Sequence, residues 1–503
     1  MKKFKGLGTL LLITILLLSF SIPVFAGGTS GSITMKNSGG NIKTDSLYSA
    51  YKIVGWNMSK VGSDVLYTDM VLTSKYKADI VTSLGAPLVA TSSDADVLKA
   101  VAALNETDDA KKVAKLAVDL SSVVGVAEYT ATAGVFTNLP YGYYLIMETA
   151  NNASDGTVLS KPILVSVPDK KEGNSAVSVT VKTSTATVEK DIVIGDGANA
   201  TNVKAAEKKI GDTVNYKLTA TIPTYAANAT GISYYITDTL SKGLTLTQGS
   251  IIVQDFKGVV IPVSGNYTET VTTNIDESTA LKIDFTYDKI KDLGPLTITY
   301  SATLNQSAKV GSTGNPNSVT LTYSNNPGSG GSSYTTPPKH TIVYTTGIQL
   351  TKVDVNAKQT KLSGATFEIY KDHALSICLG TAVTDKDGIA YFPGLDAGTY
   401  WIKETIAPAG YDLLKDPIEV KIGVTLPKTV TNGNELAEWN TTTPGFANTG
   451  NLGIICGEVI NTKGFQLPGT GGMGTTLFTV GGVILLGVAV GLLLIYRRKK
   501  KHA

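Results

Sequence analysis

Alternation of apolar and polar residues recurs along most of the chain and predicts short β-strands. Residues 319–323 (Val-Thr-Leu-Thr-Tyr) and 341–344 (Thr-Ile-Val-Tyr) are rich in β-branched and aromatic residues, which is typical of strands with one buried face. Gly, Asn and Asp turns separate many such segments. The pattern predicts a mainly β fold of tandem immunoglobulin-like antiparallel sandwiches.

One segment, between residues 94 and 123, has helical periodicity instead. Its periodic apolar positions are Val97, Leu98, Val101, Leu104, Val113, Leu116, Ala117 and Leu120. This spacing predicts two short helices inserted in the first domain. We expect them to pack against its sheet.

The N-terminus has the pattern of a secretory signal. Three lysines among the first five residues precede an apolar run from Leu10 to Leu18, and Val24 and Ala26 fit the positions that a signal peptidase reads. The apolar run is too short for a membrane anchor. We therefore predict export of the chain and removal of residues 1–26.

The C-terminus combines a spanning segment with a basic tail. Residues 475–496 are 22 residues without a charge, and residues 497–501 are all Arg or Lys. At about 1.5 Å per residue, such a helix crosses a hydrocarbon core of about 30 Å. The basic tail would hold this end in the cytoplasm, so that the rest of the chain lies outside the cell.

Charge and composition exclude several classes of function. The formal net charge is +3, but eight Lys and Arg lie in the two terminal segments, which contain no acid, so residues 27–470 carry −5. The basic character gives no support for nucleic-acid binding. The three His have no metal-ligand spacing, and no Ser/His pair or paired carboxylates suggest a hydrolase. We expect no enzyme activity toward other molecules, no metal and no cofactor.

Cysteine usage excludes a disulfide framework. Only Cys378 and Cys456 occur, and both fall in the last domain. Their pairing and their persistence as two thiols remain open alternatives.

A five-residue motif precedes the spanning segment. Its residues are Leu467, Pro468, Gly469, Thr470 and Gly471. Together with the helix, the basic tail and the signal peptide, the motif resembles the cell-wall sorting signal of Gram-positive surface proteins. The resemblance implies that a sortase thiolate attacks the Thr470 carbonyl, releases the chain from Gly471 onward, and passes Thr470 to an amine. The chain would be anchored in the membrane transiently and then joined to the cell surface.

The last domain resembles the B-type repeat of collagen-binding adhesins (Cna) and pilins. The matching segments are residues 350–354, 364–370, 384–388, 400–411 and 459–462. The resemblance implies a Cna-type sandwich in which a Lys of the first strand and an Asn of the last strand form an isopeptide bond, assisted by a buried Glu.

These roles fall on Lys352, Asn461 and Glu404. Burial would lower the pKa of the lysine, so that a neutral amine exists, and would favour the protonated acid. A protonated acid can polarise the Asn carbonyl and help to expel ammonia.

The preceding domain resembles the middle domain of backbone pilins. Residues 187–192 resemble its first strand, residues 235–244 its acid-bearing strand, and residues 317–327 its acceptor strand. The resemblance implies a second isopeptide bond in this domain.

The second bond would join Lys190 to Asn317, with Asp238 as the acid. Asn315 is an alternative acceptor. The acid is also an open assignment, because relatives differ in which strand carries it.

The end of the first domain resembles that of backbone pilins in residues 162–168 and 177–183. In that family a lysine at this place attacks the sortase-bound Thr of another subunit. The family motif is aromatic-Pro-Lys-Asn, and residues 180–183 read Thr-Val-Lys-Thr here. The resemblance assigns the linkage to Lys182.

The departure from that motif leaves alternatives. Lys170 and Lys171 could be the nucleophile instead. Thr183 replaces an Asn that some relatives use as a crosslink acceptor. We therefore expect that Lys36 and Glu148 form no internal bond and that the first domain stays uncrosslinked.

The resemblance spans nearly all of the mature chain and implies five segments. They are a signal peptide (1–26), an N-terminal pilin domain (27–185), a middle isopeptide-forming domain (186–348), a Cna B-type domain (349–463), and the sorting signal with its helix and basic tail (464–503).

The function implied is that of a major shaft subunit of a covalent pilus, in which Thr470 of one subunit joins Lys182 of the next. Expected partners are a pilin-specific sortase, other copies of the chain, ancillary tip or base pilins, peptidoglycan through a housekeeping sortase, and a host surface ligand. The alternative is a monomeric wall-anchored adhesin that binds a host protein or glycan.

Overall fold

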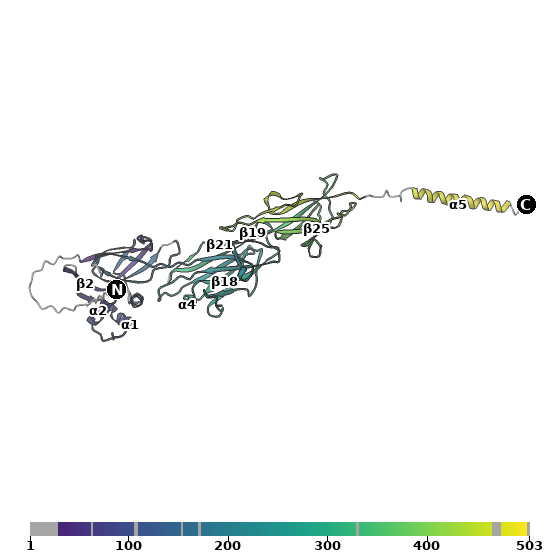
Figure 1. Cartoon of the computed structure of the whole chain (residues 1–503). Helices are drawn as coiled ribbons and strands as arrows, with labels where there is room; N and C mark the ends of the chain where they lie inside the picture. The colour runs from purple at the N-terminus through teal and green to yellow at the C-terminus, as the bar shows by residue number, and fades with distance from the viewer. Residues whose placement is uncertain are drawn as a thin grey trace, which may run out of the picture.

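The computed structural model describes residues 29–61, 64–104, 109–151, 154–169, 173–327, 331–464 and 474–499. Most of these residues lie in strands, which form three sandwiches that follow one another along an elongated molecule (Figure 1). The predicted mainly β class is confirmed. The predicted signal peptide lies outside the described residues.

The N-terminal sandwich packs a three-stranded sheet against a five-stranded one. The smaller sheet contains β1 (Ser30–Lys36), β5 (Val135–Pro140) and β8 (Ala176–Thr180). The larger sheet contains β2 (Ser46–Val61), β3 (Asp64–Leu72), β4 (Tyr129–Ala131), β6 (Gly142–Asn151) and β7 (Ile163–Val167). Strand β1 lies between β5, antiparallel, and β8, parallel.

Helices are inserted between β3 and β4. They are η1 (Ser74–Tyr76), α1 (Lys77–Leu84), α2 (Asp94–Ala103) and α3 (Ala110–Ser121). Helices α2 and α3 are the two predicted from periodicity. Ser93 begins α2 with a reciprocal capping box to Asp96, which satisfies free amides of the first turn. Helix α1 was not predicted, because in its eight residues only Ile80 and Val81 are buried, too few for a period to show.

The middle sandwich also has two sheets. The first contains β9 (Val188–Ile194), β10 (Thr201–Val203), β12 (Thr213–Ala220), β14 (Leu244–Leu246), β15 (Ile252–Gln254) and β18 (Leu296–Leu304). The second contains β11 (Ala205–Glu207), β13 (Tyr234–Leu240), β16 (Tyr267–Thr273), β17 (Thr279–Phe285), β19 (Gly311–Asn326), β20 (Ser332–Thr335) and β21 (Lys339–Asp354). Short helices η2 (Gly197–Asn199) and α4 (Tyr287–Ile290) join strands. In β18 every second residue is buried, as the alternating sequence predicts.

Strand β21 continues from the middle sandwich into the C-terminal sandwich (Figure 1). Its residues 339–345 pair with β19. Its later residues pair with β24 and, in parallel, with β29. The expected domain boundary between residues 348 and 349 therefore falls inside one continuous strand.

The C-terminal sandwich completes this shared sheet and adds a five-stranded one. Strands β24 (Ile389–Leu395), β28 (Phe446–Asn448) and β29 (Ile455–Asn461) belong to the sheet of β21. The other sheet contains β22 (Thr366–Tyr370), β23 (Cys378–Val383), β25 (Gly398–Ile406), β26 (Ile418–Thr425) and β27 (Glu438–Thr441), and η3 (Thr449–Asn451) precedes β29.

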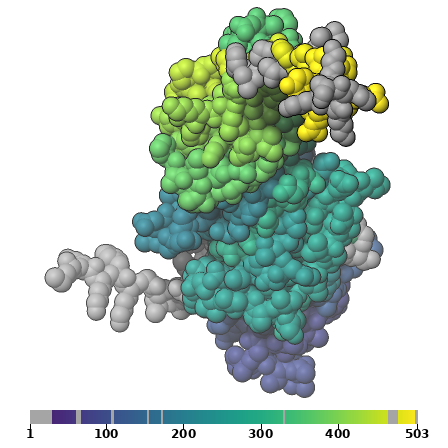
Figure 2. All heavy atoms as spheres, turned by 90° about the vertical axis from the view of Figure 1, so that its right-hand side faces the viewer, coloured from purple at the N-terminus to yellow at the C-terminus, as the bar shows by residue number. Residues whose placement is uncertain are grey.

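The N-terminal and middle sandwiches are joined through the segment 154–160. Tyr323 donates its hydroxyl to the Gly156 carbonyl at 2.7 Å, and the Leu159 amide donates to the Asn325 carbonyl at 3.0 Å. Gly156 has a φ of +78°, and a Cβ there would lie 2.4 Å from the Tyr334 ring, so only glycine fits. In Figure 2 the teal middle sandwich lies between the purple N-terminal and the green C-terminal sandwiches.

Helix α5 (Gly474–Lys499) projects from the far end of the molecule (Figure 1). Its residues Phe478–Arg498 are long and apolar enough to cross a membrane. This segment overlaps the uncharged run from which the sequence predicted a spanning helix.

Candidate functional site

The three residues assigned to the C-terminal crosslink meet in the interior of that sandwich. Lys352 lies on β21, Asn461 on β29 and Glu404 on β25, and all three are buried. Lys352 is opposite Val459 in the parallel pair, which places Asn461, two residues further on, on the same face. Glu404 approaches from the opposite sheet.

An amine, a carboxamide and a carboxyl group are in contact there. The Lys352 Nζ donates to the Asn461 Oδ1 and, at 3.3 Å, to the Val459 carbonyl. The Asn461 Nδ2 is 3.1 Å from both Glu404 oxygens, and the Lys352 Nζ is 3.8 Å from Glu404 Oε1. One acid therefore reaches both nitrogens that an amide exchange would involve.

Burial makes the Lys352 amine reactive. Desolvation lowers its pKa from 10.5 to about 8, although the nearby Glu404 carboxylate works in the opposite direction. At pH 7 about one molecule in ten then carries the neutral amine, against about one in three thousand for an ordinary lysine.

The middle sandwich holds a second buried cluster. Lys190 lies on β9, Asp238 on β13 and Asn317 on β19, and each is fully buried. Asp238 is opposite Val319, so Asn317 is its diagonal neighbour on the same face. The lysine comes from one sheet, and the acid and the amide come from the other.

A tyrosine that the sequence analysis missed joins this cluster. The Lys190 Nζ donates to Asp238 Oδ2 at 2.5 Å and to the Tyr300 hydroxyl at 2.7 Å. The Asn317 Nδ2 donates to the same hydroxyl at 2.8 Å. The alternation of β18 buries Tyr300, but nothing in the sequence separates it from the other tyrosines of the chain.

Burial favours the neutral forms of both charged groups in this cluster. Desolvation lowers the pKa of Lys190 and raises the pKa of Asp238, against their mutual attraction. Oδ1 of Asp238 and Oδ1 of Asn317 are buried and have no hydrogen-bond partner among the described residues. A proton on Oδ1 of Asp238 would make this atom a hydrogen-bond donor. The Asn317 carbonyl oxygen, which has no donor within the described ranges, is an acceptor that such a proton could polarise.

The alternative acceptor Asn315 has other partners. Its Oδ1 accepts from the Lys309 amide at 2.8 Å, and its Nδ2 donates to the Val343 carbonyl at 3.2 Å. Asn317, and not Asn315, shares the Tyr300 hydroxyl with Lys190.

Lys182 lies two residues beyond β8, in the connection to the middle sandwich, and its side chain is exposed. The preceding amide, of Val181, donates to the Lys36 carbonyl at 2.8 Å. Lys170, Lys171 and Thr470 lie outside the described residues, as does the rest of the motif from Leu467 to Gly471.

Glu148 of the N-terminal sandwich contacts a different lysine from the one considered in the sequence. Its carboxylate accepts from the Ser46 hydroxyl at 2.5 Å, from the Ser160 amide at 2.6 Å and from the buried Lys43 Nζ at 3.4 Å. Lys36 lies on β1 and is not among these donors. Within the described residues, no hydrogen bond joins an Asn side chain to Lys43 or Glu148.

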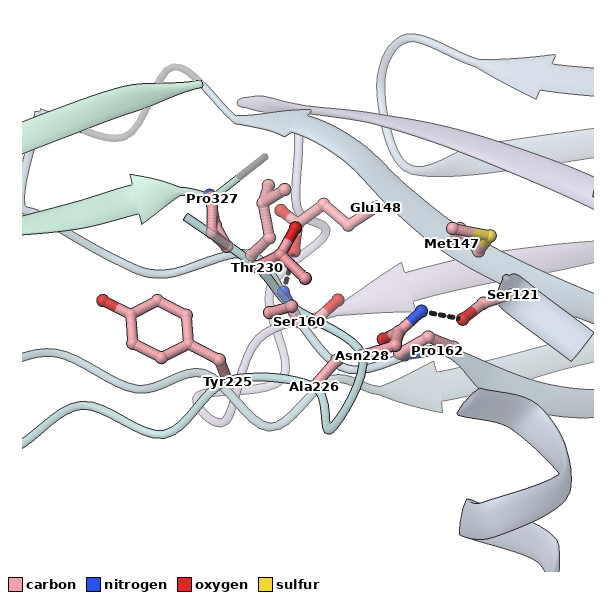
Figure 3. A pocket seen from close by; sticks show the side chains of 12 residues that line it. Ser121, Met147, Glu148, Ser160, Pro162, Tyr225, Ala226, Asn228, Thr230 and Pro327 are labelled. Atoms are coloured by element: carbon pink, nitrogen blue, oxygen red, sulfur yellow. Dashed lines mark hydrogen bonds between the residues drawn. The ribbon is translucent and has the colours of Figure 1, made fainter. Parts of the chain in front are cut away.

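This cluster borders a cavity of about 200 Å³ between the N-terminal and middle sandwiches (Figure 3). Figure 3 shows the Ser160–Glu148 bond on one side and, on the other, Asn228 donating to Ser121. The Asn228–Ser121 bond joins the two sandwiches beside the cavity.

Cys378 and Cys456 are both free in the structure. Among the described residues, no group of His, Cys, Asp and Glu is placed to hold a metal ion.

Family models match three segments of the chain. Residues 210–327 match the Cna-B-like domain of Gram-positive pilin backbone subunit 2, residues 346–436 match a prealbumin-like fold domain, and residues 460–503 match the LPXTG cell wall anchor motif. The Cna-B-like description therefore falls on the middle segment, whereas the sequence motifs suggested that type for residues 349–463.

Individual relatives are also pilins. The chain is 28% identical over 364 residues to the trypsin-resistant surface T6 protein of Streptococcus pyogenes, covering 59% of this chain and 67% of that protein. The structure of the T6 backbone pilin, with three domains, matches with a TM-score of 0.55 at 21% identity, covering 87% of this chain and all of that one. The major pilin SpaD of Corynebacterium diphtheriae gives a TM-score of 0.48 at 17% identity, covering 86% and 98%.

Removal of the Asp238 carboxylate should destabilise the middle sandwich strongly. In an Asn317→Ala chain, where no amide to Lys190 can form, we expect Asp238→Ala to lower the free energy of unfolding by about 3–5 kcal/mol, because the buried Lys190 amine loses its Asp238 partner. Pulse proteolysis in urea, with cleavages mapped to residues 188–335, measures this change in the free energy of unfolding.

The control is Asp284→Ala, which removes a half-exposed carboxylate 2.7 Å from Lys282 and should lower the free energy of unfolding by less than about 1 kcal/mol. Equal effects would contradict the assignment of a buried charge pair.

Proposed function

The chain belongs to the backbone pilins of Gram-positive pili, and on that premise we propose that it is polymerised head to tail by a sortase through Thr470 and Lys182 and stabilised by two internal Lys–Asn amides. The LPXTG anchor and the apolar helix α5 place it at the cell surface, anchored to the wall. As a backbone pilin it is a shaft subunit of the pilus.

The observation that carries the internal amides is the C-terminal cluster. Lys352, Asn461 and Glu404 are buried and in contact. The neutral Lys352 amine attacks Cγ of Asn461, a new C–N bond forms, and Glu404 takes the extra proton from Nζ. Glu404 then gives this proton to Nδ2, the old C–N bond breaks, and ammonia leaves.

The middle cluster supports a second amide of a different geometry. Lys352 and Asn461 are on neighbouring strands of one sheet, whereas Lys190 and Asn317 face each other across the sandwich. A Lys352–Asn461 bond would join the first and last strands of the C-terminal sandwich. A Lys190–Asn317 bond would join the two sheets of the middle sandwich. Each should stabilise its sandwich by about 2–5 kcal/mol by restricting the unfolded chain.

The proposed linkages define a short covalent path for tension along a pilus. From Lys182 the path runs to Lys190, crosses to Asn317, follows β19, β20 and β21 to Lys352, and crosses to Asn461. Residues 191–316 and 353–460 lie off this path. A force along the pilus would therefore act on this covalent path, and most strands of the two sandwiches would not bear the tension.

Polymerisation requires an accessible amine at the base of the neighbouring subunit. Lys182 is exposed and lies in the connection between two sandwiches. The partners we propose are a pilin-specific sortase, other copies of the chain, ancillary tip or base pilins, and peptidoglycan at the base through a housekeeping sortase.

The intact mass of residues 27–463 tests the internal amides. Each amide releases one ammonia, about 17 Da, so we expect a mass about 34 Da below that of the sequence. Lys190→Ala and Asn461→Ala should each restore one ammonia, and Asn315→Ala should restore none. An unshifted mass would remove the proposal of internal bonds. A third lost ammonia would contradict the expectation that the N-terminal sandwich has no amide.

The rate of the C-terminal amide should depend on pH. As the pH rises toward the Lys352 pKa of about 8, the neutral amine becomes more abundant, so the rate should rise about tenfold from pH 6 to pH 7 and level off above about pH 8.5. An Asn317→Ala chain, recovered unfolded and refolded at each pH, isolates this bond, and mass spectrometry gives the rate. A flat rate between pH 6 and pH 8 would show that deprotonation of Lys352 does not limit the reaction.

The linkage residue is tested by the detergent-resistant ladder of pili from whole cells. Lys182→Ala should abolish the ladder and leave single subunits, because the proposed acceptor amine is lost. The matched control, Lys170→Ala with Lys171→Ala, should keep it. A ladder that survives Lys182→Ala would overturn this assignment, and a wild-type chain that runs only as a single subunit would favour a solitary wall-anchored adhesin.

A further inference from the structure

The nitrogen that must leave Asn317 donates a hydrogen bond to a phenol and not to the acid of the cluster. Its Nδ2 donates to the Tyr300 hydroxyl at 2.8 Å. The Lys190 Nζ donates to the same oxygen at 2.7 Å. One phenol thus touches both the nitrogen that attacks and the nitrogen that departs.

In the C-terminal cluster, the departing nitrogen can be protonated without a phenol. There the Asn461 Nδ2 contacts both oxygens of Glu404 at 3.1 Å, so the acid can deliver a proton to the departing nitrogen. In the middle cluster Asp238 contacts Lys190 through Oδ2, and its Oδ1 has no partner among the described residues. A different group must protonate Nδ2.

We propose that the Tyr300 hydroxyl is a catalytic proton relay for the Lys190–Asn317 amide. This inference rests on the proposed internal amide and adds a residue and a step to it. Lys190 first gives a proton to Asp238, and its neutral amine attacks Cγ of Asn317, while Asp238 returns the proton to the carbonyl oxygen.

The relay then moves one proton between the two nitrogens. The Tyr300 oxygen accepts a proton from Nζ, and the Tyr300 hydroxyl proton passes to Nδ2. The C–Nδ2 bond breaks, ammonia leaves, and the carbonyl reforms as its proton goes back to Asp238. Tyr300 ends as it began, and every proton is accounted for.

The surroundings of Tyr300 suit a relay better than a permanent base. The side chain is buried, and its ring is stacked on that of Tyr216 with centroids 5.1 Å apart and an angle of 23°, which fixes the direction of the hydroxyl. Burial and the nearby Asp238 raise the pKa of Tyr300 well above its usual value. The phenol therefore stays neutral and can both accept and donate a proton.

Tyr300→Phe removes the hydroxyl and keeps the stacked ring. The matched control is Tyr234→Phe, which removes a buried hydroxyl of the same sandwich that donates to the Thr221 carbonyl at 2.8 Å. Both variants lose buried hydrogen bonding, but only the first loses contact with the reacting nitrogens.

The experiment uses the full chain produced in a Gram-positive host. The protein is labelled in a pulse, sampled during a chase, denatured in acid and digested, and the linked peptides carrying Lys190 and Asn317 are quantified. Linked peptides carrying Lys352 and Asn461 from the same digest serve as an internal clock. We expect Tyr300→Phe to slow the middle bond by about 100-fold or more relative to this clock, and Tyr234→Phe to change it by less than about threefold.

A middle bond that forms at the wild-type rate in Tyr300→Phe would overturn the relay while leaving the proposed amide intact. Absence of linked peptides from the wild-type chain would instead overturn the amide itself. If Tyr300→Phe leaves the middle sandwich protease-sensitive, fluorotyrosine at position 300 replaces it, since it keeps the ring and the hydroxyl but makes the phenol more acidic. A changed rate then supports the relay, and an unchanged rate overturns it.

Discussion

The burial of two lysine amines is the constraint on which the rest of this structure depends. An ammonium group without water is unstable unless a counter-charge and hydrogen-bond acceptors surround it. Lys190 and Lys352 are both fully buried, each beside one acid and one asparagine. Such a site favours the loss of charge. The Lys352 amine is in contact with the Asn461 carboxamide, and the Lys190 amine shares the Tyr300 hydroxyl with the Asn317 carboxamide. Burial of the lysines therefore opposes folding, but it also favours a reaction whose covalent amide would stabilise the folded state.

The two sites differ because the lysines enter from different sheets. In the C-terminal sandwich the lysine and the asparagine share a sheet, and the acid reaches across to the departing nitrogen. In the middle sandwich the lysine reaches across, so the acid and the asparagine share a sheet and the acid meets the amine. Tyr300 of β18 then occupies the place between the two nitrogens. In the mechanism that we propose, the same residue types therefore use different proton paths in the two sandwiches.

Strand β21 ties these sites into one mechanical unit. It begins beside β19, which carries Asn317, and it carries Lys352 near its end. Ile342 and Tyr344, from its first half, are part of the C-terminal hydrophobic core. The connection between the two sandwiches is thus a paired and buried strand and not an unpaired linker. Two hydrogen bonds of the segment 154–160 with β19 connect the N-terminal sandwich to the middle one.

The sequence by itself determined the features that depend on local order: the β class from alternation, α2 and α3 from periodicity, the spanning helix from its length, and the export and sorting motifs from their sequence of charges and apolar runs. It also indicated Lys352, Glu404 and Asn461, because a family motif preserves their order along the chain. Tertiary structure alone decided what depends on distance across a core. We favour Asn317 over Asn315 because Asn317 bonds the same Tyr300 hydroxyl as Lys190, whereas Asn315 bonds the Val343 carbonyl. The lysine partner of Glu148 is Lys43 because β6 and the segment after β1 meet there. Tyr300 could not be chosen from sequence, because a buried tyrosine acquires a role only from the two nitrogens that packing brings to its hydroxyl.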